Sequence, residues 1–403
     1  MMKVLITGGS IAGPAVALGL QRAGFSVTLL ERAAQARSAG QNVDVRGAGH
    51  EALRRMGLRD SVAGASTGEL GTRFLRPDGT VYASVPVRPG RDGPTAELEI
   101  LRGQLSHLLL RATAAEAEHR YGDHLVLVDQ DEHGVDVVSA AGRRERYDLL
   151  VIAEGRRSRT RDLAFTSQAD YRDLGQYVAY GTIDRAGTDD RWWRWLTTTG
   201  SRVASLRPDN IGTMRAALAF LAPPLGLNRL DVEAQIAVLR TRFAGVGWET
   251  ERILDGFAAR PAEFYFERVE QVRTPHWSEG RVAIVGDTAW GAPTGMGTSL
   301  ALLGAYVLAG EITVERDRGG AFDPARAFRA YEQRLRPHIE KTQRVPPGVP
   351  AAALPKSRWG LAVLQGAHRL AATRALSGLA DRALPSSAAA GLTLPDYPLP
   401  HPH

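Results

Sequence analysis

The sequence predicts an α/β protein in which a parallel-sheet domain is interrupted by a second domain built on an antiparallel sheet. Residues 3–30 contain an apolar run, a glycine-rich turn, a helical stretch and a second apolar run, a right-handed parallel strand–helix–strand unit. Apolar strands of the fully buried type return at 149–153 and 281–285, whereas residues 165–275 carry alternating strands typical of antiparallel sheets. A chain of 403 residues is also too long for one ordinary core, so two domains are expected.

The first elements follow from local signals. Residues 3–6 are apolar and β-branched, residues 15–22 are helical, Gly24 ends that helix, and residues 26–30 form the second strand. A helical stretch over 49–56 follows and is stopped by the next glycine. This order is the beginning of a nucleotide-binding fold.

The later elements are predicted in the same way, with Asp231 as the cap of one helix. We expect helices at 101–117 and 231–243, a long helix from Ser299, and strands at 125–129, 135–139, 177–183, 203–207, 213–220 and 264–269. Residues 346–355 form a proline-rich linker to a last helical piece, after which the Pro-rich tail is expected to be loose.

These elements give a provisional division of the chain. The expected segments are 1–72, 101–164 and 276–345 for the nucleotide-binding domain, 73–100 and 165–275 for the sheet domain, and 346–403 for a C-terminal helix and tail.

Composition is that of a soluble globular protein and excludes several chemistries. The absence of cysteine removes thiol nucleophiles, cysteine redox pairs and cysteine-ligated metals. The ten histidines show no metal-ligand spacing, so no metal is expected. With no disulfide and no signal peptide, the expected compartment is the cytoplasm.

The net charge of +6 does not indicate a nucleic-acid partner. Basic residues are spread along the chain among carboxylates, and all but Lys3, Lys341 and Lys356 are arginine. A nucleic-acid-binding protein more often shows a basic stripe with stacking aromatic residues. An arginine-rich composition explains the excess.

Residues 288–310 carry no charge and match a membrane-spanning helix in length. Their first half contains Gly291, Pro293, Gly295 and Gly297, so only the remainder can be helical. A loop running into a buried helix is the better interpretation, and no membrane partner is expected.

The turn at residues 8–13 nearly matches the dinucleotide-binding fingerprint. Gly8 allows the tight turn, Gly13 lets helix and strand pack closely, and the helix N-terminus at Ile11 and Ala12 can hold a pyrophosphate. Ser10 stands where the middle glycine is usual, which weakens the motif on its own. Glu31 supports it, because a carboxylate at the end of the second strand can accept both ribose hydroxyls.

A second constellation covers residues 286–297, between a buried strand and a helix. Asp287 can hydrogen-bond a polyol chain, and the glycines allow backbone N–H groups to approach a ring that gains negative charge. A reduced flavin with its ribityl chain meets both descriptions. Since the two nucleotide signals lie about 280 residues apart, one extended cofactor, FAD, is expected to bridge them.

With these motifs the chain resembles the class A FAD-dependent aromatic hydroxylases. The resemblance rests on the turn with Glu31, on Arg102 in LRGQL, on the run 148–155, and on the loop at Asp287. Residues 37–44 followed by 47–58 look most like the tetracycline-inactivating branch. The family implies a glutathione-reductase-type, Rossmann-like FAD domain, an inserted antiparallel substrate sheet, a C-terminal helical segment, and NADPH or NADH as co-substrate.

The resemblance also implies roles for individual residues. Glu31 would hold the adenosine ribose, Asp287 the ribityl chain, and residues 295–298 the pyrimidine edge of the flavin, while Arg37 would meet the nicotinamide nucleotide. The implied cofactor contacts are Gly8, Ser10, Ile11, Ala12, Gly13, Glu31, Arg32, Arg37, Asp44, Arg102, Glu154, Gly155, Asp287, Pro293, Gly295, Met296, Gly297 and Thr298.

Four positions depart from the family pattern. Ser10 replaces glycine, Glu154 replaces the usual Asp before Gly155, Trp290 replaces a frequent His, and Ser299 replaces a frequent Asn or Gly. These departures bear on the reductant and on the efficiency of flavin reduction.

The implied reaction is an oxygenation. NAD(P)H reduces the flavin, O2 adds at C4a, and the hydroperoxide gives one oxygen atom to an aromatic or polycyclic small molecule, by hydroxylation or by ring-opening insertion. Because a dry pocket matters more than a side-chain acid, no catalytic acid or base is assigned. The aromatic residues considered for the pocket wall are Trp192, Trp193, Trp195, Phe220, Phe264 and Phe266.

Two alternatives stay open, as does the oligomeric state, monomer or homodimer. A flavin halogenase shares the FAD domain, but Leu196-Thr197 follows the Trp193–Trp195 run where halogenases have Ile-Pro. A flavin-binding pathway protein without turnover would explain the departures from the family pattern.

Overall fold

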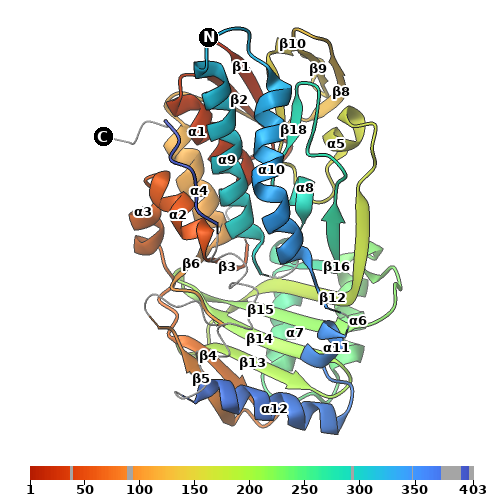
Figure 1. The fold of residues 1–403 in the computed structure, drawn as a ribbon. Coiled ribbons are helices and arrows are strands. Elements are labelled where there is room, and N and C mark those ends of the chain that lie inside the picture. The colour runs from red at the N-terminus through yellow and green to blue at the C-terminus, as the bar shows by residue number, and fades with distance from the viewer. Residues whose placement is uncertain (37–39, 89–93, 292–294, 347, 374–391, 399–403) are drawn as a thin grey trace.

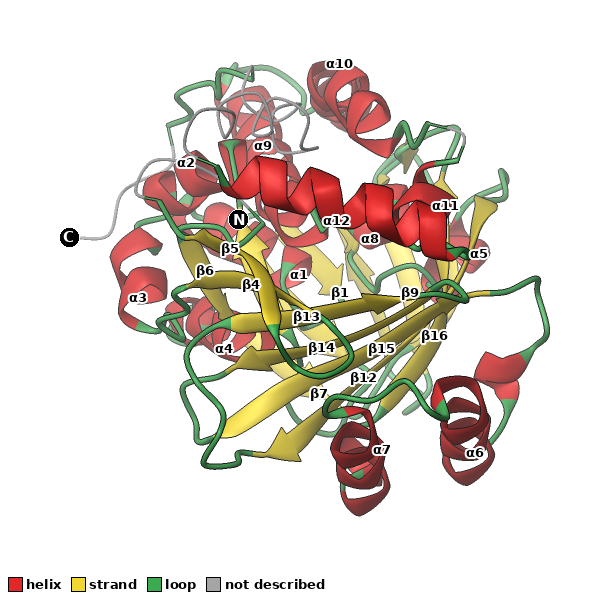
Figure 2. Ribbon diagram, turned by 90° about the horizontal axis from the view of Figure 1, so that it is seen from below, coloured by secondary structure: helices red, strands yellow, loops and turns green. Residues whose placement is uncertain are grey.

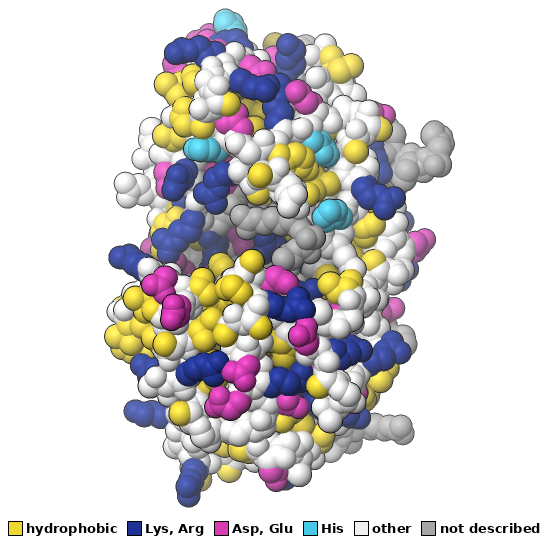
Figure 3. Space-filling view, turned by 180° about the vertical axis from the view of Figure 1, so that it is seen from behind, with side chains coloured by type: hydrophobic (Ala, Val, Ile, Leu, Met, Phe, Trp, Pro, Cys, Tyr) yellow, Lys and Arg dark blue, Asp and Glu magenta, His cyan; other side chains and the backbone are white. Residues whose placement is uncertain are grey.

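The structure is a computed structural model that describes residues 1–36, 40–88, 94–291, 295–346, 348–373 and 392–398. Figure 1 shows an elongated molecule with a helix-covered parallel sheet at one end and a broad antiparallel sheet at the other. The predicted class is confirmed: an α/β domain, an inserted antiparallel sheet and a C-terminal helical segment. On the face in Figure 3, basic and acidic side chains are interspersed.

A six-stranded sheet forms the centre of the first domain. Its order is β17 (Ser278–Glu279), β18 (Val282–Ile284), β11 (Leu149–Ile152), β1 (Lys3–Thr7), β2 (Ser26–Glu31) and β7 (Glu118–Tyr121). All neighbours pair in parallel except β17 with β18. Strands β11 and β18 are buried at every position, as their continuous apolar runs predict.

Helices cover both faces of this sheet (Figure 1). They include α1 (Ala12–Arg22), α2 (Ala48–Arg55), α3 (Arg59–Gly64), α4 (Arg102–Thr113), α5 (Arg159–Ala164), α8 (Asp287–Trp290), α9 (Gly297–Asp317) and α10 (Pro324–Gln343). Helix α9 is long and apolar enough to cross a membrane, but 83% of its most apolar 18-residue stretch is buried inside the protein. It packs against α1, α2 and α10 and is therefore a core helix, as predicted.

Two small sheets flank the first domain. One contains β8 (Leu125–Gln130), β9 (Val135–Ser139) and β10 (Arg144–Tyr147), and the other pairs β3 (Asn42–Val45) with β6 (Leu98–Leu101). The second pair matters for the site, because Asn42, at the start of β3, donates to Pro208 O in the antiparallel sheet.

The second domain is a seven-stranded sheet with two clearly different faces. Its order is β16 (Tyr265–Arg273), β12 (Asp170–Asp184), β15 (Thr213–Leu221), β14 (Arg202–Pro208), β13 (Trp193–Thr198), β4 (Gly71–Leu75) and β5 (Val81–Pro86). Helices α6 (Val232–Phe243) and α7 (Thr250–Ala259), with short turns at Leu227–Arg229 and Pro261–Glu263, lie on one face (Figure 2). Asp231 caps α6 as predicted, by accepting from Ala234 N.

Some strands were not predicted, because they form by pairing with strands that are distant in the sequence. A helix was predicted over 101–117, but α4 ends at Thr113. The residues just after the predicted helix, 118–121, form β7, which pairs with β2. Strand β13 and helix α7 were also not predicted, and β13 exists because it pairs with both β14 and β4.

The C-terminal part contains α11 (Val349–Ala353) and α12 (Arg358–Ala372). The expectation of a loose tail is wrong for residues 392–398. Tyr397 is buried against α9, where its ring lies over Gly310 and its hydroxyl donates to Glu311 Oε1 at 2.5 Å. An apolar ring and a charge-assisted hydrogen bond fix this segment to the core.

We predict that Gly310→Ala weakens this attachment. An alanine Cβ at position 310 would lie 2.2 Å from the Tyr397 ring, so the ring must move and the free energy of unfolding should fall by about 1–3 kcal/mol. Thermal unfolding and limited proteolysis of the tail measure the effect. Gly366→Ala in α12, where a Cβ meets nothing within 4 Å, is the control and should be neutral or slightly stabilising. Tail cleavage equal to that of the wild type would contradict the prediction.

Candidate active site

The carboxyl ends of β1, β11 and β18 meet at one edge of the parallel sheet, where close backbone contacts require glycine. Gly8 has φ of +103°, and a Cβ there would lie 2.3 Å from Ala153 O. A Cβ on Gly13 would lie 2.0 Å from Gly8 O. A Cβ on Gly286 would come within 3.0 Å of the Ala12 Cβ. Turns from the two ends of the chain are thus in direct contact.

Glu31 lies beside the first turn. One carboxylate oxygen accepts from Gly9 N at 2.7 Å and the other from Ala33 N at 2.8 Å. Helix α1 begins at Ala12, and no described side chain caps its N-terminus. The helix therefore presents free N–H groups to an anion next to a carboxylate that can accept ribose hydroxyls.

Asp287 opens α8 on the opposite side of the turn. None of the described residues donates a hydrogen bond to its carboxylate, and burial raises its pKa although Arg156 and Arg102 act in the other direction. The Asp287 carboxylate is thus an acceptor without a donor in a poorly hydrated place, and the hydroxyl groups of a polyol chain could supply the donors.

The start of α9 lies near this carboxylate in sequence. Gly295 is exposed with φ of +73° and open space around its Cβ position, Met296 is buried, and Gly297 and Thr298 begin the helix half-exposed. No described side chain caps this N-terminus either. Its N–H groups are free to face a ring edge that carries negative charge.

Arg102 is the exposed first residue of α4 and connects the first turn with the loop before β3. Its guanidinium donates to Ser10 Oγ at 3.4 Å, and its backbone N–H donates to Gln41 O at 3.0 Å. Ser106 Oγ, one turn along α4, donates to Ser10 O at 2.7 Å. The serine in the usual glycine position is therefore integrated into the turn through both its side chain and its carbonyl.

Asp44, on β3, is held in a buried ion-pair network that joins the two domains. It accepts from Arg207 Nη2 at 2.7 Å and from Arg46 Nη2 at 3.0 Å. Arg207 comes from β14 of the antiparallel sheet and also donates to Glu69 at 2.6 Å. Burial raises the pKa of Asp44, but the two arginines outweigh it and the pKa lies below its usual value.

A further carboxylate completes the network. Glu99, opposite Asp44 on β6, accepts from Asn42 and Thr67. Its burial raises its pKa to about 7, and burial also raises the pKa of Glu69. Sequence analysis missed Arg207, Glu69 and Glu99 because they come from segments far apart in the chain, with no local motif.

Glu154 lies between β11 and α5, and its carboxylate faces α5. It accepts from the Ser158 hydroxyl at 2.8 Å and from the Thr160 hydroxyl at 2.6 Å. Gly155, with φ of +86°, donates its N–H to Thr288 Oγ1 at 2.9 Å. The Glu154 side chain thus stabilises the turn before α5, and the Gly155 backbone connects this turn with the loop at Thr288.

The remaining predicted positions are less informative. Arg32 follows Glu31 and is exposed. Arg37 and Pro293 lie outside the described residues. Trp290 is buried in an aromatic cluster with Trp277 and Tyr331, with ring centroids 4.4 and 6.1 Å away. Among the described residues, no group of His, Asp and Glu is placed to hold a metal ion.

The face of the antiparallel sheet opposite α6 and α7 has a row of four residues in register across adjacent strands. Tyr180 pairs with Ala217, Ala217 with Ser205, and Ser205 with Trp195. Ala217, on a central strand, is still partly exposed. The row therefore forms a floor of two small residues between two aromatic side chains, and we call it the sheet floor.

This floor lies between two other rows on the same face. On one side Arg215 pairs with Arg207, whose guanidinium stacks 4.3 Å from the Trp193 ring and reaches Asp44. On the other side Val203 and Ala219 are covered by Leu354. The floor is thus next to the row that contacts β3.

The six aromatic candidates divide between the faces. Phe220, Phe264 and Phe266 pack into the core under α6 and α7 and cannot line this face. Trp192 stacks with Arg73 at 4.4 Å. Of the six, Trp193 and Trp195 lie on the face of the sheet floor, 5.0 Å apart in an edge-to-face contact.

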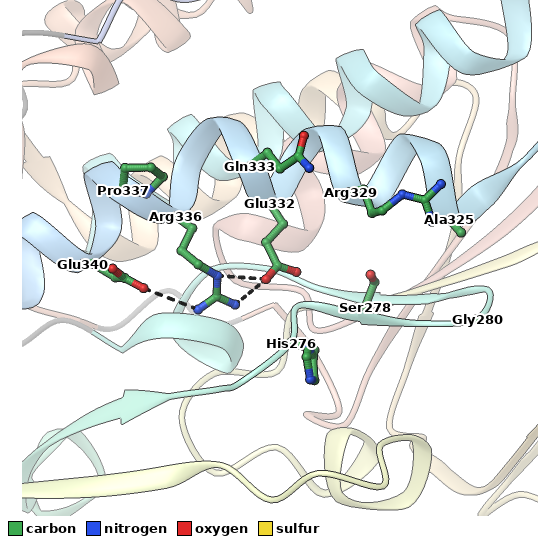
Figure 4. Close-up of a pocket in the computed structure, with 10 residues that line it drawn as sticks. All are labelled: His276, Ser278, Gly280, Ala325, Arg329, Glu332, Gln333, Arg336, Pro337 and Glu340. Carbon is green, nitrogen blue, oxygen red and sulfur yellow. Dashed lines mark hydrogen bonds and ion pairs between the residues drawn. The ribbon is translucent and has the colours of Figure 1, made fainter.

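A surface cavity of about 620 Å³ lies elsewhere, between α10 and the loop around β17 (Figure 4). Arg336 spans it with ion pairs to Glu332 at 2.5 Å and Glu340 at 3.8 Å. A smaller cavity of about 180 Å³ continues along α10 to Trp290. Their described lining residues include none of the predicted cofactor contacts.

Comparison with known proteins agrees with this geometry. The family model described as "FAD binding domain" matches residues 1–342. The flavin-dependent monooxygenase eupH of Phoma sp is 34% identical, covering 98% of both chains, and a flavin-dependent monooxygenase of Legionella longbeachae is 32% identical, covering 85% of this chain and 87% of its own. The crystal structure of tetracycline destructase Tet(55) superposes with a TM-score of 0.83 at 28% identity, over 98% of this chain and 99% of the other.

The fold, the site and these relatives define an FAD-dependent monooxygenase, an oxidoreductase. The chain belongs to the class A FAD-dependent aromatic hydroxylases, and its likeness includes the tetracycline-inactivating branch. The residues present fit FAD, because two uncapped helix N-termini and a carboxylate without a described partner surround one sheet edge.

We predict that Asp287→Ala weakens FAD binding by about 10- to 100-fold, because the variant lacks the carboxylate that would accept from the ribityl hydroxyls. Fluorescence titration of the apoprotein with FAD measures this. The control is Asp148→Ala, at the opposite end of the strands, where the carboxylate accepts from Lys3 N. Equal affinities of Asp287→Ala and wild type would contradict the assignment.

The raised pKa of Glu99 predicts a pH-dependent stability. The folded state holds a proton that the unfolded chain, with a pKa near 4.5, releases. The stability that this proton gives to the folded state is fully present below about pH 4.5 and is lost as the pH rises through about 7. The free energy of unfolding of Glu99→Gln, relative to that of the wild type, should therefore increase by up to about 3 kcal/mol between pH 5 and pH 8. Chemical denaturation across this range is the measurement; a difference that does not change with pH would contradict it.

Proposed function

We propose that the protein takes electrons from NADPH or NADH and inserts one atom of O2 into an aromatic or polycyclic small molecule bound on the sheet floor. The observation that carries this proposal is the junction between β3 and the antiparallel sheet. Asn42 Nδ2 donates to Pro208 O at 2.9 Å, Gln41 Nε2 donates to Gly181 O at 3.4 Å, and Arg207 pairs with Asp44. A substrate on the floor would thus be close to β3, the strand that we expect to contact the cofactor through Asp44.

FAD, when bound, supplies the redox chemistry and the reaction with O2. The chain itself would bind and orient the two partners. Glu31 and the α1 N-terminus would hold the adenosine diphosphate part, while Asp287 and the α9 N-terminus would hold the ribityl chain and flavin edge.

The sheet floor would position the substrate and keep water away. Tyr180 and Trp195 would offer aromatic faces to a planar ring system, and only the small side chains of Ala217 and Ser205 lie between them. Substrate class is inferred from this shape and from relatives named for tetracycline and p-nitrophenol chemistry. Water exclusion favours oxygen transfer over wasteful release of peroxide.

The function is tested with purified, FAD-loaded protein. Anaerobic mixing with NADPH or NADH should bleach the flavin absorbance, and admission of O2 with a panel of phenols and polycyclic phenols should give a product heavier by one oxygen. Failure of both nicotinamides to reduce the flavin would contradict the proposal. Reduction without substrate-stimulated NAD(P)H oxidation for any panel member would favour a flavin-binding protein without turnover.

We predict that Ala217→Leu blocks the sheet floor. A leucine would fill the space between Tyr180 and Trp195 and should raise KM by about tenfold or more, while FAD affinity stays unchanged. Ala237→Leu on the exposed side of α6 is the matched control. Steady-state kinetics and FAD titration separate the two effects; an unchanged KM in Ala217→Leu would place the substrate elsewhere.

A further inference from the structure

Helix α12 carries an apolar stripe on the side that faces away from the protein. Trp359, Val363, Gly366 and Leu370 follow one another at helical spacing along this side. Trp359 is 80% exposed, Val363 55% and Leu370 54%. We call these four residues the α12 stripe. Large apolar side chains that are exposed together commonly mark an interaction surface.

The opposite side of α12 is fixed to the antiparallel sheet, so the stripe is held in one orientation. His368 stacks on Phe74 with ring centroids 3.8 Å apart, and its Nδ1 lies 2.8 Å from the Tyr82 hydroxyl. Ser357 caps the helix by accepting from Gly360 N at 3.1 Å. The stripe therefore belongs to a docked, capped helix.

The charged residues of α12 itself all have one sign. Arg358 and Arg369 lie along one edge of it, at neighbouring angular positions on the helix. In the sequence from 341 to 373 there are five Lys or Arg residues and no Asp or Glu. An apolar helix side with a cationic edge is the pattern of helices that lie in a membrane interface.

The position of α12 suits a flat partner. Figures 1 and 2 agree that the helix lies across the end of the molecule farthest from the parallel sheet, with its axis roughly perpendicular to the long direction of the molecule. A planar surface could therefore meet the whole stripe while the parallel-sheet domain stands away from it.

We propose that the α12 stripe docks on the surface of a bilayer that contains anionic lipids. Trp359, Val363 and Leu370 enter the headgroup boundary, and Arg358 and Arg369 pair with lipid phosphates. A second copy of this chain is a poorer occupant, because two such helices would bring together cations with no acidic residue on either helix to pair with them. In this proposal α12 lies on the membrane surface and does not cross the bilayer. The proposal differs from the sequence-based expectation that the protein has no membrane partner.

Flotation of the full-length protein with vesicles tests the proposal. We expect binding to phosphatidylcholine vesicles that contain about one third phosphatidylglycerol, and at least about tenfold weaker binding to pure phosphatidylcholine. Trp359→Ser with Leu370→Ser should reduce binding about tenfold or more, and Arg358→Gln with Arg369→Gln should remove most of the preference for anionic lipid. Ile211→Ser, at a 59% exposed residue of the β14–β15 turn, is the control and should bind as the wild type does.

Two further readouts make the outcome decisive. The emission of Trp359, obtained as the difference between the fluorescence of the wild type and that of Trp359→Phe, should shift to the blue when vesicles are added. Thermal unfolding should show that each variant is folded. No flotation with anionic vesicles, or flotation unchanged in Trp359→Ser with Leu370→Ser, would overturn the proposal. A dimer in light scattering that the same double variant dissociates would show that a second copy, and not a membrane, covers the stripe.

Discussion

Close contact between backbone turns at one edge of the parallel sheet is the constraint on which the site depends. Gly8 lies against the end of β11, and Gly286 lies against Ala12 at the start of α1. A Cβ at Gly8 would overlap Ala153 O, and a Cβ at Gly286 would press against Ala12, so a side chain at either glycine would strain the edge that β1, β11 and β18 share. Because the two turns are in contact, residues about 280 positions apart can hold a single extended cofactor.

The second domain depends on a different interaction. Arg207 of the antiparallel sheet pairs with Asp44 and Glu69 in the interior, and Trp193 stacks on the same guanidinium. Buried charges are costly unless they are paired, so this network penalises any arrangement in which the sheet moves away from β3. It therefore fixes the position of the sheet floor relative to β3. Burial in the same network raises the pKa of Glu99, and the nearby Glu69 carboxylate adds to that effect.

Local patterns were sufficient for much of the fold. The glycine turn, the apolar runs of β1, β11 and β18, and the cap of α6 depend on residues close in sequence, and all appear as predicted. Strands β7 and β13 could not be predicted, because their partners in the sheet decide them. The buried tail at Tyr397 was missed for the same reason: a proline-rich segment becomes ordered only where Gly310 leaves room for the ring. For the site, motifs and the family resemblance predicted Glu31, Asp44, Arg102 and Asp287 as cofactor contacts, but only the folded chain brings Arg207 to Asp44.

Ligand-fragment binding tests most directly whether one FAD molecule is held by both turns, about 280 residues apart in the chain. Calorimetry would compare FAD, FMN and ADP on the apoprotein and on two variants, Glu31→Ala and Gly286→Ala. Glu31→Ala should weaken FAD and ADP but leave FMN unchanged, whereas Gly286→Ala should weaken FAD and FMN more than ADP. Variants that weaken the same ligands equally, or FAD binding unaffected by either change, would contradict a single cofactor that bridges the two turns.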